Sequence, residues 1–373
     1  MKLTQILSTM KNLSDVFMKK IYSLVLYSLF AWMPFDFAVS QSIKGAGSSA
    51  AAPIYQSWGL EYQKTVNTQV AYESIGSSAG LKKIREDTTD FGASDVAPSA
   101  TELVKSGLVV FPIAITGVAP VVHLPSLADR PILLDGETLA DIFLGEISIW
   151  NDPRIKLLNP NLKLPEMRIK VVVRSDGSGT TYNFADYLAK VNSAWATKYG
   201  VKTSFTWPQT FIGAKGSDGV VQAVKTTVGA IGYVDFGYVK ANALKSIQLK
   251  NASGIFVAPS NQGFSDALSR SEWPNKGSFT STLTNQQGFG AWPITMGTFA
   301  IFPQVTNRPD ETTRALEFFV WAFMNGDKLV QKNNFVRLPD RMQSLAYKTI
   351  MSIKSKSGAP LNVKVVSKTA SQN

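Results

Sequence analysis

Short apolar runs, glycine-containing turns and stretches of helical spacing follow one another along this chain. Residues 169–173, IKVVV, are a run of β-branched residues typical of a buried strand. Beyond the turn at residues 174–180, apolar residues return at intervals of three and four positions, as on one face of a helix. These residues are Phe184, Tyr187, Leu188, Val191 and Trp195. The pattern predicts a strand, a glycine turn and a helix in succession.

A second strongly apolar stretch, LVVFPIAITGVAPVVHL at residues 108–124, raises the question of a membrane span. Pro112, Gly117 and Pro120 argue against a membrane helix. The β-branched residues favour buried strands separated by turns, at a place where the chain crosses between domains. His123 follows this apolar run, and we expect it to be a structural residue.

Residues 1–40 are expected to be a secretory signal peptide. Two lysines follow Met18, an apolar region extends over residues 21–35, and small residues stand at Ala38 and Ser40. Because a complete signal begins at Met18, we expect translation to start there. An uncleaved membrane anchor is the alternative. No cysteine follows the apolar region to carry a lipid anchor, so the expected location is the periplasm of a Gram-negative bacterium.

The composition limits the available chemistry. The 373 residues are 45% hydrophobic and 17% charged, which is typical of a globular chain with two domains or one large one. There is no cysteine and one histidine, so thiolate catalysis and cysteine-bound zinc are excluded and a histidine base is disfavoured. The formal net charge of +11 is spread along the chain without interleaved aromatic residues. We therefore expect no nucleic-acid partner, no metal and no cofactor.

The turn RSDGSGTT at residues 174–181 has the composition of an anion site. A helix N-terminus presents N–H groups without intrahelical partners and a partial positive charge. The arginine fork suits a tetrahedral oxyanion, and we expect Asp176 to hold Arg174 in place by a salt bridge. The groups offered to the anion are Arg174, Gly177, Ser178, Gly179 and Thr180.

Three other turns repeat this arrangement. GAGSS at residues 45–49 and IGSSAG at 75–80 precede helical spacings, and FGASD at 91–95 ends a strand-like run in a carboxylate. The four turns are interpreted as one site assembled from distant segments. A fifth turn, KGSDG at 215–219, is given a wall or capping role, with Asp218 as a helix N-cap. No turn has the glycine spacing of a Walker A or dinucleotide motif, which disfavours nucleotide binding.

At these turns the chain resembles the periplasmic phosphate-binding proteins of high-affinity phosphate ABC transporters. The resemblance covers nearly all of residues 43–361. The matching stretches, in the order of that family, are GAGSS from 45, IGSSAG from 75, FGASD from 91, IFLGEISIWNDPRIKLLNP from 142, LP and RSDGSGTT between 164 and 181, GAIGYVDFGY from 229, and AWPIT from 291.

The resemblance implies an α/β protein with the two-lobed periplasmic binding protein fold of type II, which closes on one dehydrated phosphate in the cleft between its lobes. It places lobe one at residues 41–114 plus 293–373 and lobe two at residues 115–292. Residues 362–373 lie beyond the usual end of the family and are expected to be a flexible tail. Carried over by position, the phosphate-binding residues are Ser49, Ala50 through its backbone N–H, Ser77, Asp95, Arg174, Ser178, Gly179 and Thr180, with Asp176 supporting Arg174.

The resemblance also implies a monomeric receptor, not an enzyme, that carries phosphate to an inner-membrane ABC permease. Phosphate keeps a proton near neutral pH and sulfate has none, so Asp95 would accept that proton and repel sulfate. One alternative is a protein of this fold that binds another oxyanion or acts as a surface adhesin or phosphate sensor. A less favoured one is a secreted phosphatase using Ser178. The family usually has threonine at the position of Ser49 and commonly phenylalanine at that of Ala50, so the wall beside the anion is smaller here.

Overall fold

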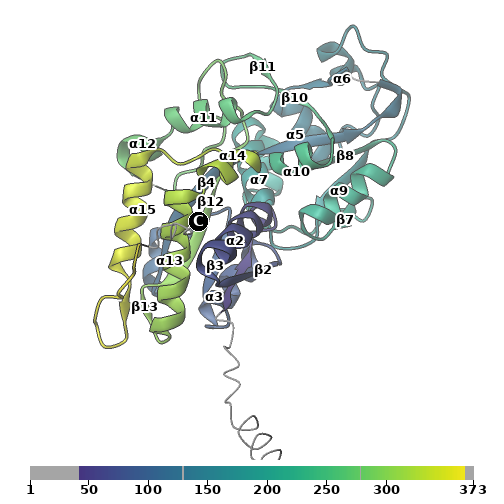
Figure 1. The fold of residues 1–373 in the computed structure, drawn as a ribbon. Coiled ribbons are helices and arrows are strands. Elements are labelled where there is room, and N and C mark those ends of the chain that lie inside the picture. Colours follow the sequence, from purple (N-terminus) through teal and green to yellow (C-terminus); the bar gives the residue numbers. More distant parts are fainter. Residues whose placement is uncertain (1–41, 128–129, 278, 366–373) are drawn as a thin grey trace, which may run out of the picture. The chain divides into compact units, whose positions relative to one another are not determined.

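A mixed β-sheet is the framework of the residues that the computed structural model describes, 42–127, 130–277 and 279–365 (Figure 1). Its strand order is β2-β1-β3-β12-β4-β8-β6-β7, and β9 also pairs with β4. β1 lies parallel to β2 and β3, and β6 lies parallel to β7 and β8, whereas β4 and β12 run antiparallel to their neighbours. The strands are β1 (Ser42–Gly47), β2 (Gln69–Ser74), β3 (Phe91–Ser94), β4 (Leu108–His123), β6 (Lys170–Arg174), β7 (Ile212–Ala214), β8 (Ala230–Asp235), β9 (Lys245–Ser246) and β12 (Thr295–Pro303).

Strand β4 joins the two halves of this sheet. Its residues 108–117 pair with β12, and its residues 118–123 pair with β8. The prediction of several strands separated by turns in this stretch is wrong, because the structure has one continuous strand. Pro112 is accommodated beside a register shift between Thr298 and Phe299, an irregularity at which a residue without an N–H is tolerated. The chain nevertheless crosses between the sheet halves here, as the sequence indicated.

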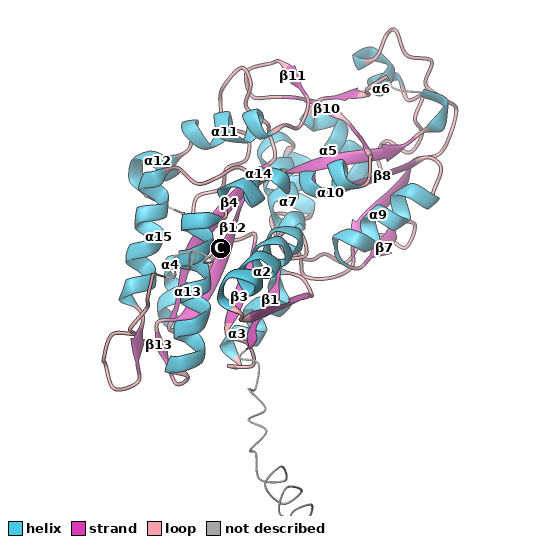
Figure 2. Ribbon diagram, in the orientation of Figure 1, coloured by secondary structure: helices cyan, strands magenta, loops and turns pink. Residues whose placement is uncertain are grey.

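The helices pack on the two halves of the sheet (Figure 2). We call β1, β2, β3 and β12 with α2, α3 and α13 the first lobe, and β6, β7 and β8 with α5, α7 and α9 the second lobe. The exact lobe boundaries at 114/115 and 292/293 stay a prediction. The helices are α2 (Ala52–Val66), α3 (Ser77–Arg85), α4 (Ala100–Ser106), α5 (Gly136–Leu144), α6 (Pro153–Leu158), α7 (Gly179–Val191), α8 (Ser193–Lys198), α9 (Gly216–Thr226), α10 (Phe236–Ala241), α11 (Asn261–Arg270), α12 (Glu272–Lys276), α13 (Pro309–Asn325), α14 (Asp327–Lys332) and α15 (Asp340–Ser352).

Short elements complete the architecture outside the main sheet. β5 pairs in parallel with β10, which pairs in antiparallel with β11. β13 pairs in parallel with β14 near the end of the described chain. These elements are β5 (Leu133–Leu134), β10 (Gln248–Lys250), β11 (Phe256–Val257), β13 (Val305–Thr306), β14 (Lys354–Ser355) and the 3₁₀ helix Pro125–Leu127.

The buried apolar side chains form two large clusters. One lies mainly in the first lobe, and the other lies mainly in the second lobe. In the second, the rings of Phe184 and Tyr233 stack with their centroids 4.2 Å apart. The Tyr233 hydroxyl lies 2.8 Å from Thr181 Oγ1 and accepts a hydrogen bond from the Arg174 N–H at 3.4 Å. Because Tyr233 is fixed by the core, this contact sets the end of β6 relative to the start of α7.

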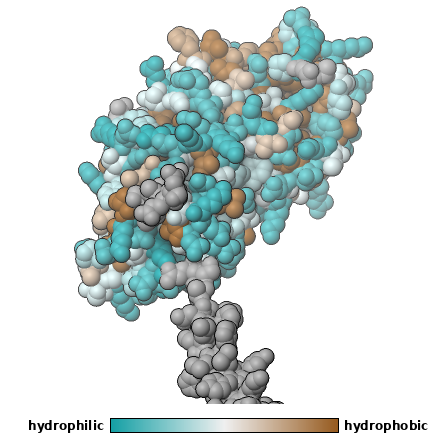
Figure 3. Space-filling model, viewed as in Figure 1, coloured by the Kyte–Doolittle hydropathy of each residue, from teal (hydrophilic) through white to brown (hydrophobic). Residues whose placement is uncertain are grey.

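The C-terminal segment contacts the first lobe. The described part of the predicted tail, residues 362–365, is not free: Val363 packs against the first-lobe cluster, and the Lys364 N–H donates to Glu317 Oε1 of α13 at 3.0 Å. Residues 366–373 and the predicted signal peptide lie outside the described residues. The face seen in Figure 3 is mainly hydrophilic, with hydrophobic side chains in smaller groups. Over the described residues, no helix has the length and apolar character needed to cross a membrane.

Candidate functional site

The four turns found in the sequence lie at the ends of strands. β1 leads to α2, β2 leads to α3 and β6 leads to α7, while β3 leads to Asp95. Gly76 precedes α3 with a φ of 91°, a value that favours glycine. Ser178 is the N-cap of α7, and its Oγ accepts a hydrogen bond from the Thr181 N–H at 3.1 Å. The predicted order of strand, turn and helix is confirmed at these positions.

The turns of the two lobes contact each other directly. The Gly179 N–H donates to Ser77 Oγ at 3.1 Å, and the Ser78 N–H donates to the Gly177 carbonyl at 3.1 Å. A Cβ on Gly179 would lie 2.7 Å from both Ser77 Oγ and Asp95 Cβ. The close approach of the lobes therefore depends on the missing side chain at position 179.

Arg174 ends β6, and its side chain is buried against Asp176. Its Nε donates to Asp176 Oδ1 at 2.7 Å and its Nη2 donates to Oδ2, so the expected ion pair is present. The Gly216 N–H also donates to Asp176 Oδ1, at 3.0 Å. Burial alone would raise the pKa of Asp176, but the hydrogen bonds and charge of Arg174 and the Gly216 N–H hold that pKa below its usual value. Asp176 stays ionised and fixes the plane of the guanidinium group.

Asp95 follows β3 and is 3% exposed. Its Oδ2 accepts a hydrogen bond from the Ser48 hydroxyl at 2.6 Å, whereas its Oδ1 has no hydrogen-bond partner in the described part of the chain. Burial raises the pKa of Asp95 to about 6, although the Ser48 hydrogen bond, the Thr298 hydroxyl and the Arg174 charge oppose the shift. An unpartnered oxygen in a protein interior is costly. Oδ1 is therefore available to a ligand that carries a proton.

Two hydroxyl groups lie at the first turns of α3 and α7. Thr180 is 1% exposed, and its Oγ1 likewise has no hydrogen-bond partner among the described residues. Ser77 Oγ accepts from the N–H groups of Gly179 and Asp95, the latter at 3.3 Å. Since these bonds use its lone pairs, the Ser77 hydroxyl proton is left for another acceptor. Helix N-termini favour an anion at this place.

Ser49 and Ala50 precede α2 and are both buried. Ser49 Oγ lies 3.0 Å from Ser217 Oγ and accepts a hydrogen bond from the Ser217 N–H at 3.1 Å. The Tyr238 hydroxyl donates to the Ser49 carbonyl at 3.0 Å. The Ala50 side chain packs in the apolar cluster that lies mainly in the second lobe, so Ala50 can offer an anion only its backbone.

Hydrogen bonds connect the predicted residues of both lobes. Ser77 contacts Gly179, Asp95 contacts Ser77, and the residues around Gly216 contact both Asp176 and Ser49. The cluster combines a fixed positive charge, hydroxyl donors and one carboxylate acceptor, which are the groups that a protonated tetrahedral oxyanion requires. In the described residues, no group of three or more histidine, aspartate or glutamate side chains is placed to hold a metal ion.

Sequence reasoning missed Ser48, Asn183 and the contact made by Ser217. Asn183 Nδ2 donates to the carbonyls of Asp95 at 2.8 Å and Gly179 at 2.9 Å, so it joins the lobes. Ser48 and Ser217 had a sequence signal, because they lie in the GAGSS and KGSDG turns, whereas Asn183 had none. The prediction that Asp218 is an N-cap is wrong.

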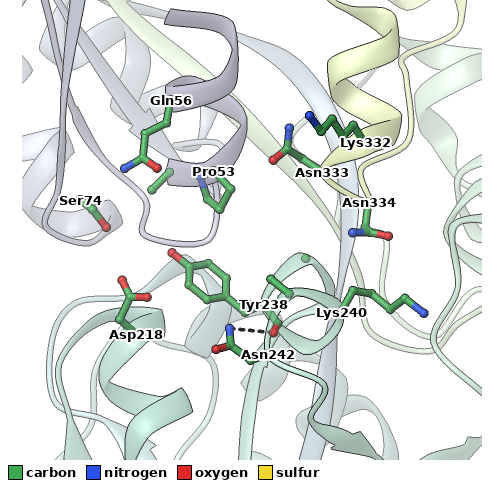
Figure 4. Close-up of a pocket in the computed structure, with 13 residues that line it drawn as sticks. Pro53, Gln56, Ser74, Asp218, Tyr238, Lys240, Asn242, Lys332, Asn333 and Asn334 are labelled. Carbon is green, nitrogen blue, oxygen red and sulfur yellow. Dashed lines mark hydrogen bonds between the residues drawn. The ribbon is translucent and has the colours of Figure 1, made fainter. Parts of the chain in front are cut away.

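The start of α9 explains that error. Lys215 occupies the N-cap position and makes no side-chain capping bond, and Asp218 stands three residues further on, within the first helical turn. There its carboxylate faces a cavity of about 660 Å³, which lies beside the cluster and is lined by residues of α2, α9, α10 and α14 (Figure 4). Tyr238 is part of this lining, and its hydroxyl bond to Ser49 connects the cavity wall to the cluster.

Comparison with known sequences identifies relatives over most of the chain. A family model described as the PBP superfamily domain matches residues 38–323. The phosphate-binding protein PstS of Xylella fastidiosa is 43% identical over 303 residues, which are 81% of this chain and 83% of that protein. PstS of Pasteurella multocida is 39% identical over 338 residues, which are 90% of this chain and 97% of that protein.

Solved structures show the same fold. The phosphate-binding protein from Stenotrophomonas maltophilia has a TM-score of 0.64 at 20% identity and covers 83% of this chain and 93% of its own. This likeness supports the two-lobed α/β fold, while the sequence relatives carry the family assignment. The chain belongs to the PstS family of phosphate-binding proteins within the PBP superfamily.

Proposed function

We propose that this protein binds one inorganic phosphate ion between its lobes and delivers it to an inner-membrane ABC permease for uptake. The observation that carries the proposal is the pair of unpartnered buried oxygens, Asp95 Oδ1 and Thr180 Oγ1, in a cluster that also holds the buried Arg174. The relatives' printed name, phosphate-binding protein, supports the same ligand. The proposed binding set is Ser49, Ala50, Ser77, Asp95, Arg174, Ser178, Gly179 and Thr180.

Each group has a defined task toward phosphate. Arg174, held by Asp176, supplies charge and planar donors to the phosphate oxygens. The hydroxyls of Ser77 and Thr180 donate, together with N–H groups at the helix starts. Asp95 Oδ1 accepts the proton that phosphate keeps near neutral pH. Sulfate has no such proton, so it would place a bare oxygen against Asp95 without a hydrogen bond.

Closure follows from the division of the ligand groups between the lobes. Ser49, Ser77 and Asp95 come from the first lobe, and residues 174–180 come from the second. An ion in the cleft therefore has more partners when the lobes are together, and this difference shifts the population to the closed state. We propose that the permease recognises that closed state, and that the receptor is a monomer.

The proposal extends to location and to the absence of catalysis. We propose export to the periplasm, which rests on the signal pattern in residues 1–40. A serine nucleophile is activated by an adjacent base or by a metal ion. The only histidine of the chain is His123, in β4, and the described residues contain no group of three or more histidine, aspartate or glutamate side chains placed to hold a metal. A phosphate-ester turnover assay tests this point, and release of alcohol at a rate proportional to protein concentration would overturn it.

The direct test is calorimetric titration of residues 41–373 after removal of co-purified ligand by reversible unfolding. Phosphate and sulfate are titrated at matched ionic strength. We expect tight one-to-one binding of phosphate with little or no heat from sulfate. Sulfate bound as tightly as phosphate would assign the site to oxyanions in general. A folded protein that binds neither ion would contradict the proposal and favour the adhesin or another ligand.

A further inference from the structure

A buried contact across the lobes involves a residue outside the proposed binding set. Ser217 is the second residue of α9 and has no exposed surface. Its N–H and its hydroxyl both face Ser49 Oγ, at 3.1 and 3.0 Å. Ser217 belongs to the second lobe and Ser49 to the first, so a ligand-binding hydroxyl of one lobe is held by the other.

The direction of these hydrogen bonds determines what Ser49 can do. A serine hydroxyl has one proton and two lone pairs. The Ser217 N–H occupies one lone pair of Ser49 Oγ, so the Ser49 proton is left for a second partner. Ser217 Oγ, as the donor in the 3.0 Å contact, occupies the other lone pair, so the second partner of the Ser49 hydroxyl must be an acceptor for its proton. With both lone pairs of Ser49 Oγ filled by Ser217, a phosphate oxygen is the acceptor that completes the hydrogen bonding of this buried hydroxyl.

The same turn also acts on the opposite wall of the site. The Gly216 N–H donates to Asp176 Oδ1, and Asp176 fixes Arg174. The first turn of α9 therefore contacts the supports of two ligand groups, Ser49 in the first lobe and Arg174 in the second. Serine also lacks the β-branching that restricts a threonine rotamer, so the Ser49 hydroxyl depends on an external contact for its direction.

We propose that Ser217 is a positioning residue, which directs the Ser49 hydroxyl toward the bound anion and makes this direction conditional on closure of the lobes. The inference rests on the proposed function. Ser217 itself does not contact the anion, because its N–H and its hydroxyl are both engaged by Ser49. Ser217 therefore affects phosphate binding only through Ser49, and this dependence can be measured.

The test is a double-mutant cycle with wild type, Ser217→Ala, Ser49→Ala and the double variant, each titrated with phosphate. We expect Ser217→Ala alone to raise the Kd about fivefold to tenfold, the value of one hydrogen bond. In the Ser49→Ala background the same change is expected to have less than about a twofold effect. An undiminished effect in that background would show that Ser217 acts independently of Ser49 and would overturn the proposal.

Kinetics separate a positioning role from a merely structural one. Because the contact joins residues of the two lobes, Ser217→Ala is expected to raise koff and leave kon unchanged in stopped-flow measurements. The matched control is Thr312→Val, which removes a hydroxyl from a buried pair with Thr306 at 2.7 Å within one lobe. That variant should lower thermal stability and leave the Kd unchanged. A lowered Tm with an unchanged Kd in Ser217→Ala would likewise overturn the proposal.

A measurement without ligand distinguishes failure of this inference from failure of the proposed function. In small-angle scattering of the ligand-free protein, Ser217→Ala is expected to shift the ensemble toward a larger radius of gyration, because a closing contact is lost. If wild type binds no phosphate but this shift occurs, the proposed ligand is wrong and the Ser49–Ser217 contact stands. Identical scattering of variant and wild type would overturn the contact's role in closure, whatever the ligand.

Discussion

Asp95 and Asp235 are both buried carboxylates at the ends of strands, yet they are bonded differently. Asp235 Oδ2 accepts from the Thr116 hydroxyl at 2.6 Å, and its Oδ1 accepts from the Gly237 N–H at 2.8 Å as the N-cap of α10. Within the described ranges of the chain, Asp95 accepts a comparable bond at one oxygen only. Burial raises both pKa values, to about 7 for Asp235 and about 6 for Asp95. A raised pKa therefore reports burial, and it is the unpartnered oxygen that separates Asp95, a proposed ligand group, from Asp235.

The largest expected effect comes from the cation near Asp95. Arg174→Ala removes the positive charge that offsets Asp95 and, in the proposed site, the anion, so we expect the Kd for phosphate to rise on the order of a thousandfold. Calorimetric titration measures it. Arg154→Ala is the matched control, because Arg154 also pairs with aspartates but lies at the exposed surface. A loss below about tenfold in Arg174→Ala would place the anion elsewhere.

The two carboxylates should differ most clearly in ligand selectivity. Asp95→Asn presents an amide in place of the acceptor oxygen, and we expect the preference for phosphate over sulfate to fall about a hundredfold. Asp235→Asn should leave that preference unchanged, because both oxygens of Asp235 already have protein partners. Competition titrations with the two anions measure the ratio. Equal losses in the two variants would remove the distinction between these residues.

In the wild type, protonation of Asp95 should reproduce part of the loss of preference for phosphate over sulfate that is expected of Asp95→Asn. Its pKa of about 6 means that the carboxyl group is mostly protonated at about pH 5 and mostly ionised at about pH 7. Once protonated, it donates a hydrogen bond and no longer repels sulfate, so sulfate affinity is expected to rise about tenfold as the pH falls across this interval. Asp95→Asn should show no such dependence. A flat sulfate profile in the wild type would contradict the assigned role.

The smallest effect concerns stability at Asp235. Its folded pKa, about 7, lies above the unfolded value of 3.8, so the stabilisation is full below about pH 3.8 and is lost as the pH rises through about 7. Asparagine resembles the protonated form of Asp235 and does not ionise, so Asp235→Asn does not lose this stabilisation as the pH rises. Between about pH 6 and about pH 7.5, Asp235→Asn should gain on the order of 1 kcal/mol relative to wild type in denaturant unfolding. A difference that is constant with pH would indicate that Asp235 is ionised throughout.

Local sequence signals were sufficient to locate the turns and most of the candidate residues. Strand, glycine turn and helix alternate within about twenty residues at Ser77 and at Ser178, so short-range periodicity locates both. The ion pair of Arg174 with Asp176 spans two residues and was also predicted. The binding roles given to these residues remain a prediction.

Contacts between residues far apart in the chain could not be predicted from the sequence. Ser48 meets Asp95 across 47 positions and Ser217 meets Ser49 across 168, and neither spacing has a periodic signal. Proline and glycine usually end a strand, so local signals predict several strands at residues 108–124. β4 continues through them because it pairs with β12 and then with β8, partners that lie far along the chain.

The continuity of β4 also bears on folding. Neither sheet half is complete without its own portion of this strand, so a chain cut between residues 117 and 118 would leave each fragment with an unpaired edge. Each lobe has its own apolar cluster, which would by itself permit two independent unfolding transitions. The shared strand opposes this separation, because melting one half frees the backbone that orders the other. We expect ligand-free protein to lose both lobes in a single cooperative transition, visible as coincident melts of aromatic fluorescence and far-UV circular dichroism.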